Sequence, residues 1–219
     1  MVTLVFVALL LAAFGLDALV VRRLEAKAPG VRRSHPDESV ELTVPRTLFF
    51  HPSHSWARLN GDGSVTVGVD ELVRTLVGDL GSVELPAVGN RLRAGSVAVT
   101  IRIGSRSLAL AAPIGGTVLA VNHDLGSDPV RLRWRPYKES WALRLSPGDD
   151  LASELASLVV GRDAERWMVA ETRRVDALFE RGLLVPPVVG ALRRAGSDGW
   201  SAFAREVLGH RWPSAEAPS

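Results

Sequence analysis

The chain contains no cysteine, and only two of its 219 residues, Lys27 and Lys138, are lysines, so 24 of its 26 basic residues are arginine. Without cysteine the chain forms no disulfide, thiolate zinc site, thiol nucleophile or iron–sulfur cluster. The formal net charge of +2 is close to neutral, so charge alone gives no reason to expect nucleic acid as a partner. The length allows one domain of ordinary size with attachments, or two small domains.

Motifs for catalysis and metal binding are also missing. The sequence has no Walker loop, dinucleotide fingerprint or nucleophile elbow. His51 and His54 are three residues apart, but no third ligand lies near them in the sequence, and catalytic zinc normally has three protein ligands. We interpret the two histidines as turn or core residues, and we expect neither a metal site nor an enzyme.

Residues 2–21 form an apolar run in which only Thr3 and Asp17 are clearly polar. Twenty helical residues span about 30 Å, the thickness of the hydrocarbon layer of a bilayer. A cleaved signal peptide is the alternative, but basic residues would then precede the run. Here they follow it, at Arg22, Arg23, Lys27, Arg32 and Arg33. The positive-inside rule therefore predicts a single-pass membrane anchor over residues 1–21, with the C-terminal body in the cytoplasm.

Beyond this run the pattern changes twice. Residues 22–47 carry charges, proline and glycine without periodicity, and we expect a linker. From residue 48, short runs separated by Gly, Pro and Asn predict a barrel or sandwich, beginning with a hairpin that turns at residues 60–63. Strands are expected at 56–59, 64–69, 81–85, 97–103, 107–111, 116–122 and 141–145. Helices are expected at 70–77, 150–160, 164–180 and 200–208, with Asp70 as a cap and a disordered tail over 211–219.

Five stretches of the middle region carry a resemblance. They are HSWARL (54–59), GDGSVTVGV (61–69), LVGDLGSVELPAVGNRLRAG (76–95), APIGGTVLAVN (112–122) and PYKESWALRLSP (136–147). In this order and spacing they resemble the H protein of the glycine cleavage system, a lipoyl-carrying relative of biotinyl and lipoyl domains. The resemblance implies a barrel-sandwich hybrid over residues 48–147, in which a hairpin presents a lipoyl-lysine at its tip. The expected fold is therefore mainly β with α additions: one transmembrane helix before this hybrid and a helical extension over residues 148–210.

The position that the resemblance marks as functional is occupied by a serine. In the family the modified lysine follows the proline of the ELP segment by nineteen residues and precedes the proline of the Ala-Pro pair by eight. Counting from Pro86 and from Pro113 leads to the same residue, Ser105. Lipoate is held by an amide to a lysine amine, which neither a serine hydroxyl nor the Arg106 guanidinium can form. Biotin also needs a lysine, and Lys138 belongs to the turn before the last strand, so we expect no cofactor.

A basic stretch is the candidate partner surface. From residue 91 to residue 138 eight basic residues outnumber two acidic ones. The arginines are Arg91, Arg93, Arg102, Arg106, Arg131, Arg133 and Arg135. Residues 131–135 alternate as a strand that places three guanidinium groups on one face. Such a surface suits an acidic protein, anionic lipid headgroups or a phosphate-bearing ligand; the alternative is that an arginine-rich composition merely decorates a solvated face.

The predicted helix over residues 164–180 has apolar groups at helical spacing. They include Trp167, Met168, Ala170, Val175, Leu178 and Phe179, with Glu171 in the same stripe. We expect this stripe to pack on its own domain as a helical cap; docking of a partner is the alternative.

These observations lead to three hypotheses. The first is a membrane-anchored, non-lipoylated H-like domain that acts as a binding or scaffolding module at the cytoplasmic face, with an unidentified protein partner. The alternative is a working lipoyl carrier in glycine decarboxylation. The third, an enzyme that reuses the hairpin, has no supporting set of residues.

Overall fold

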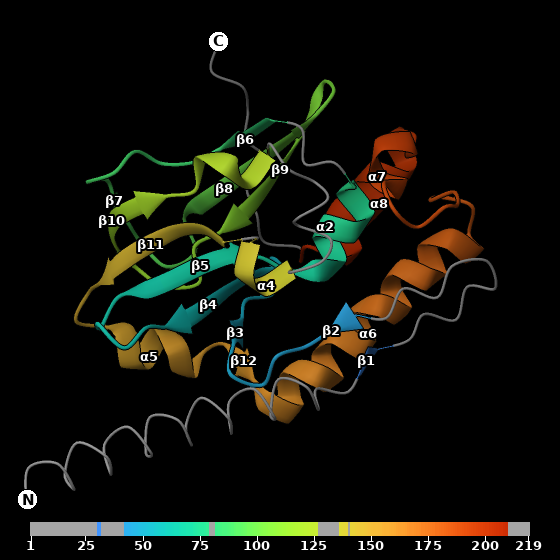
Figure 1. The fold of residues 1–219 in the computed structure, drawn as a ribbon. Coiled ribbons are helices and arrows are strands. Elements are labelled where there is room, and N and C mark those ends of the chain that lie inside the picture. The colour runs from blue at the N-terminus through green and yellow to red at the C-terminus, as the bar shows by residue number, and fades with distance from the viewer. Residues whose placement is uncertain (1–29, 32–41, 79–81, 127–135, 140, 210–219) are drawn as a thin grey trace, which may run out of the picture.

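The computed structural model describes residues 30–31, 42–78, 82–126, 136–139 and 141–209, and two antiparallel sheets form its centre (Figure 1). The larger sheet has the strand order β12-β3-β4-β5-β11-β10-β7, and the smaller one has the order β6-β8-β9. The strands of the larger sheet are β3 (Phe49–Phe50), β4 (Ser55–Leu59), β5 (Val65–Val69), β7 (Arg91–Leu92), β10 (Gly116–Val121), β11 (Trp141–Pro147) and β12 (Val159–Val160). Those of the smaller sheet are β6 (Ser82–Glu84), β8 (Val97–Ile103) and β9 (Arg106–Ala111). The prediction of a mainly β barrel-sandwich fold with helical additions is confirmed.

Both sheets contribute to one hydrophobic core. Val67 and Leu143 of the larger sheet and Ile101 and Leu110 of the smaller sheet are completely buried in the same cluster. Removing such aliphatic side chains from water stabilises the fold by roughly 1.5–3 kcal/mol each. The expected strands therefore lie where the sequence places them, with ends that differ by one or two residues.

Local sequence signals explain the first hairpin and the helix that follows it. Asp62 accepts hydrogen bonds from the amide and the hydroxyl of Ser64, and Gly63 has a φ of +80°, so this turn connects β4 to β5. The helix α2 (Glu71–Val77) begins after Asp70, whose carboxylate accepts from the Val73 amide at 3.0 Å. The predicted cap is thus confirmed.

The segment expected to be a linker is partly structured. The strands β1 (Gly30–Val31) and β2 (Leu42–Thr43) pair with each other, and Figure 1 shows them beside the long helix α6 (Gly161–Glu180). Leu42 and Val44 are fully buried in the core. The prediction of a linker that extends to residue 47 is therefore wrong for residues 42–47. Burying the apolar side chains of Leu42 and Val44 in the core stabilises the fold more than leaving them in water.

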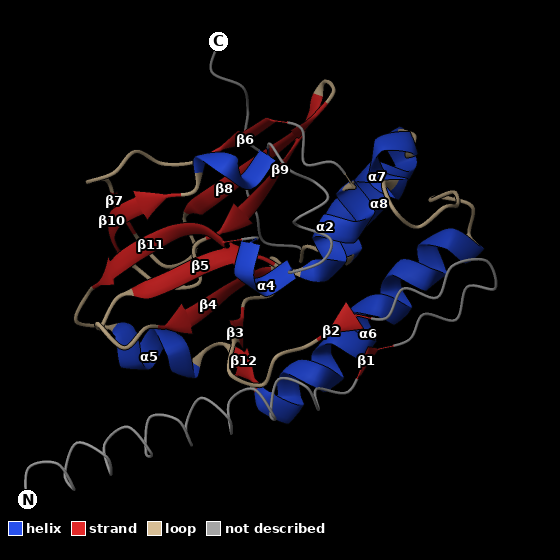
Figure 2. Ribbon diagram, viewed as in Figure 1, coloured by secondary structure: helices blue, strands red, loops and turns tan. Residues whose placement is uncertain are grey.

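Helices dominate the C-terminal part (Figure 2). They are α5 (Leu151–Ala156), α6, α7 (Ala191–Arg194) and α8 (Ser197–Glu206), while the short elements η1 (His123–Gly126) and α4 (Pro136–Glu139) precede them. The helix expected over residues 150–160 ends at Ala156, because Val159–Val160 instead pairs with β3 as a strand. Along α6 the side chains of Met168, Val175 and Leu178 are completely buried, so the apolar stripe packs on its own domain as predicted.

Three predictions fall outside the described residues. They are the anchor over residues 1–21, the basic strand over residues 131–135 and the tail over residues 211–219. In the part of the chain that the structure does describe, no helix combines the length and the apolar character needed to cross a bilayer. The anchor remains a prediction from sequence.

Candidate functional site

Strands β8 and β9 form a tight hairpin that projects from the smaller sheet (Figure 1). Ile103 pairs with Arg106, so the loop consists of Gly104 and Ser105 alone. Gly104 has a φ of +62°, the left-handed conformation that glycine supplies at the first loop position of a type II′ turn. Gly104 and Ser105 are both exposed. The structure thus places the Ser105 hydroxyl at the tip of the hairpin.

Among the described residues, no lysine amine lies at this tip. Lys138 is exposed on α4, immediately before β11, and belongs to a different part of the fold. Lys27 lies outside the described residues. The tip presents a neutral hydroxyl, which donates and accepts hydrogen bonds but forms no amide.

The two arginines beside the tip have partners within the chain. Arg102 donates to Glu84 of the neighbouring strand β6, and both side chains are about half exposed. Arg106 donates to the carbonyl oxygen of Ala195 at 2.7 Å, and its guanidinium lies 5.6 Å from the centre of the Trp200 ring. These intramolecular contacts reduce what both arginines can offer to an external ligand.

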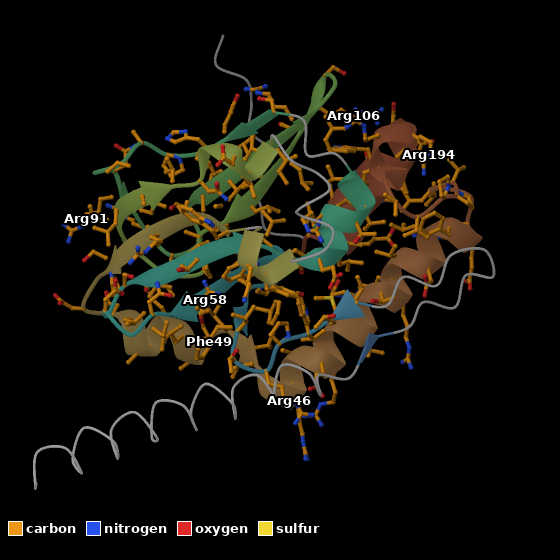
Figure 3. The ribbon with its side chains drawn as sticks, viewed as in Figure 1. Arg46, Phe49, Arg58, Arg91, Arg106 and Arg194 are labelled. Carbon is orange, nitrogen blue, oxygen red and sulfur yellow. The ribbon has the colours of Figure 1, made fainter. Side chains whose placement is uncertain are left out.

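Arg91 and Arg93 belong to another part of the surface. They are exposed on and beside the edge strand β7, where they line a hollow of about 630 Å³ together with Leu92, Ser96 and Val97. Figure 3 labels Arg91 and Arg106 far apart in this view. Arg131, Arg133 and Arg135 lie outside the described residues. Among the described arginines, the candidate partner surface is therefore divided between separate places and is not one patch.

A buried charged cluster centred on His54 was not predicted from the sequence. His54 Nδ1 donates to the Asp70 carboxylate at 2.6 Å, and Nε2 donates to the Val207 carbonyl oxygen at 3.2 Å, with a Glu171 oxygen 3.8 Å away. Burial lowers the pKa of His54, but the charge and hydrogen bond of Asp70, assisted by Glu171, outweigh it and raise the pKa to about 10. Both ring nitrogens act as donors, which is the hydrogen-bonding pattern of an imidazolium.

The neighbouring histidine has a different role. His51 Nδ1 accepts from the backbone amide of Ser53 at 3.0 Å, and the Ser53 hydroxyl, 2.8 Å from the same nitrogen, accepts from the Ala111 amide. Burial, together with the nearby charge of His54, lowers the pKa of His51. The two histidines thus serve a turn and the core, and within the described residues no group of three metal-ligating side chains is assembled.

The two antiparallel sheets and the two-residue β8–β9 loop form the barrel-sandwich architecture that the resemblance implies, a lipoyl-domain-like fold. Comparison with known proteins agrees with this fold. The signature of the family described as Glycine cleavage H-protein matches residues 48–171, more than half of the chain. The chain belongs to the glycine cleavage H-protein family.

Two sequence relatives agree with this assignment. The chain is 38% identical over 125 residues to the glycine cleavage system H protein of Shewanella denitrificans, covering 57% of this chain and 93% of the relative. It is 41% identical over 106 residues to the glycine cleavage system H protein 2 of Pseudomonas putida, covering 48% and 83%. Among solved structures, an H protein from Mycobacterium marinum is similar, with 26% identity, a TM-score of 0.46 and coverage of 55% of this chain and 95% of the other.

The family signature ends at Glu171, inside α6. The second half of α6, together with α7 and α8, lies beyond it. Among the residues that join this additional part to the barrel are Arg106 at the hairpin and His54 in the core, each of which contacts a backbone carbonyl of the extension.

Proposed function

We propose that this chain is a non-lipoylated member of the H-protein family that acts as a membrane-anchored binding module at the cytoplasmic face. The observation that carries the proposal is the exposed position of Ser105 at the tip of the β8–β9 hairpin. The resemblance marks this position as that of the lipoyl-lysine, and a serine hydroxyl forms no amide with lipoate. The hairpin is retained while its lysine amine is missing, and this favours a role in protein binding over a role as a lipoyl carrier.

A working lipoyl carrier is the second candidate, supported by membership of the H-protein family. Fold and family alone do not transmit an activity, because the activity resides in particular side chains. As a carrier, the chain would have to use Lys138 on α4 or Lys27, since these are its only lysines. A lipoyl group on either of them separates the two candidates by mass.

The binding proposal includes an acidic partner. Arg91 and Arg93 support binding of an acidic protein, because they are exposed and their charge is opposite to that of such a partner. They also line the partly apolar hollow that includes Val97. The same chemistry is proposed for Arg131, Arg133 and Arg135. An Arg–carboxylate contact that is buried within an interface is stronger than one at its rim. A partner that covers the partly apolar hollow would bury its contacts with Arg91 and Arg93 and would therefore bind them more strongly.

A pull-down with the full chain in detergent tests this surface. The variant R91E/R93E is compared with R162E/R173E, which reverses the same amount of charge at exposed positions on α6. We expect the first variant to lose a bound acidic protein that the wild type and the second variant both retain. Equal recovery on all three chains would remove Arg91 and Arg93 from the proposed surface.

The proposed anchor is tested separately by washing membranes that contain the full chain at alkaline pH. A chain inserted through residues 2–21 stays with the membrane, because a transmembrane helix is not released by disrupting ionic contacts. Release of the chain into the wash would contradict the anchor and leave the other parts of the proposal in place.

A further inference from the structure

One face of the β8–β9 hairpin is covered at its end by the C-terminal helices. Ile103 and Arg106 are directly opposed in the hairpin, so their side chains lie on the same face of the sheet. Ile103 packs against the core, and Arg106 contacts the Ala195 carbonyl after α7 and the ring of Trp200 in α8. The first residue after the tip is therefore already in contact with the extension.

The same helices are fixed to the barrel at two further points. The Gly190 amide, at the start of α7, donates to the Thr75 carbonyl of α2 at 2.9 Å, and a Cβ at Gly78 would lie only 3.0 Å from the Gly190 Cα. The Val207 carbonyl, at the end of α8, accepts from His54. Because Phe203 between these points is completely buried, α7 and α8 are packed as part of the core.

We propose that α7 and α8 form a built-in cover that prevents a modifying enzyme from closing around residue 105. The inference rests on the proposed function, and it adds that helices packed against Arg106 obstruct access to the exposed tip from one side. It draws on residues 191–208, which lie beyond the family signature of residues 48–171. The cover is therefore an addition of this chain to the shared scaffold.

The reaction that the cover would hinder is attachment of a lipoyl group to an amine. A deprotonated lysine nitrogen attacks the carbonyl carbon of lipoyl-adenylate; the new C–N bond forms as the C–O bond to AMP breaks, and the nitrogen loses a proton. The enzyme must reach residue 105 from several sides, because a lysine stem extends the amine by only four carbons beyond Cα. Helices packed against Arg106 occupy one of those sides.

Variants that carry a lysine at the tip test the cover. Full-length S105K is incubated with purified lipoate ligase, ATP and lipoate, and labelling is followed by intact mass. The same reaction is run on S105K/W200A, which removes the ring under Arg106, and on S105K/G199A, which places a Cβ against the Leu183 carbonyl closer than the 3.0 Å that real Cβ atoms keep. The matched control is S105K/S201A, at an exposed position of α8.

We expect S105K/W200A and S105K/G199A, the two variants that open the cover, to be labelled about tenfold faster than S105K. A tenfold change in rate corresponds to the loss of roughly one contact of hydrogen-bond strength between the cover and the barrel. The S201A control should behave as S105K does. Equal rates for all four chains, or no labelling of any of them, would overturn the cover, because opening it would then change nothing at the tip. Thermal unfolding shows whether each variant is folded, and the two opened variants disturb different contacts.

The wild-type chain in the same reaction keeps the two proposals apart. A lipoyl adduct on the wild type would contradict the proposed function, whatever the S105K variants do. Equal labelling of the S105K chains with an unmodified wild type would contradict the cover alone.

Discussion

His54 Nδ1 lies 2.6 Å from Oδ2 of Asp70, and both side chains are completely buried. Asp70 also caps α2, while His54 reaches Val207 at the end of α8. The pair therefore connects the first helix of the barrel to the C-terminal extension. Because a buried charge without its partner costs several kcal/mol, the members of this cluster depend on one another.

Replacing His54 by asparagine should destabilise the chain by about 3–5 kcal/mol, the usual cost of breaking a buried ion pair. Asparagine is chosen because it tolerates the positive φ of 66° found at this position. The loss leaves the Asp70 carboxylate buried without the His54 counter-charge, whereas Glu171 keeps its ion pair with Arg174. Urea unfolding of the full chain measures the change.

The double variant H54N/D70N is the control for this prediction. It should recover part of the lost free energy of unfolding, because removing the charge of Asp70 relieves its uncompensated burial. If the two substitutions cost the sum of their separate effects, His54 and Asp70 are not energetically coupled.

The stability of the chain should decrease as the pH rises from about 6.5 to about 10. The folded state holds the pKa of His54 at about 10, against 6.5 for an unperturbed histidine, so the folded state binds the proton more tightly. The stabilisation is complete below pH 6.5 and is lost as the pH approaches 10. Burial and the charge of His54 lower the pKa of His51. Protonation of His51 therefore destabilises the folded state as the pH falls below 6.5. The groups that face His54 are Asp70, Glu171 and His51.

Melting temperatures across this pH range check the prediction. The wild type should lose more stability than H54N between pH 6.5 and 10, because the variant has no imidazole to titrate. Parallel curves for the two chains would show that His54 does not carry the effect.

Leu42 should behave as a core residue although it belongs to the segment expected to be a linker. Its side chain is completely buried, so L42A should cost about 2–5 kcal/mol by leaving a cavity. The adjacent Thr43 has an exposed side chain, and T43A should change stability by about 0.5 kcal/mol or less. Chemical denaturation of both variants compares them; equal effects would argue against packing of β2 on the core.

Gly116 should not tolerate a side chain. A Cβ at this position would meet the Ser146 carbonyl closer than real Cβ atoms approach a backbone atom, because β10 and β11 pair here. G116A should therefore cost about 1–3 kcal/mol through overpacking. Gly148 has open space around its Cβ position, so G148A provides the matched control and should be nearly neutral. The midpoints of thermal unfolding distinguish the two substitutions.

Sequence predicts the elements whose signals are local. The turn at Asp62–Ser64 and the cap at Asp70 depend on residues within four positions of each other, and the structure contains both. The hairpin ending at Ser105 follows from strand patterns and from the family resemblance.

Contacts between distant parts of the chain could not be predicted in this way. His54 and Val207 are 153 positions apart, and no local pattern connects them. One sequence signal points to this buried cluster: Glu171 places a carboxylate within an apolar stripe. A carboxylate is buried only where an opposite charge lies beside it, so the stripe predicts a buried partner for Glu171. Counting charges along the sequence groups Arg102 with Arg106, but it does not reveal that Glu84 and Trp200 contact them.

Ser105 occupies the hairpin tip, and we propose that the chain carries no lipoyl group. The direct test is the intact mass of the full wild-type chain after co-expression with lipoate ligase and lipoate, with an established lipoyl-carrying protein expressed in parallel as a positive control. The unmodified mass of the chain, alongside a lipoylated control, is the predicted result. A lipoyl adduct on the chain, mapped to Lys27 or Lys138 by peptide sequencing, would contradict it.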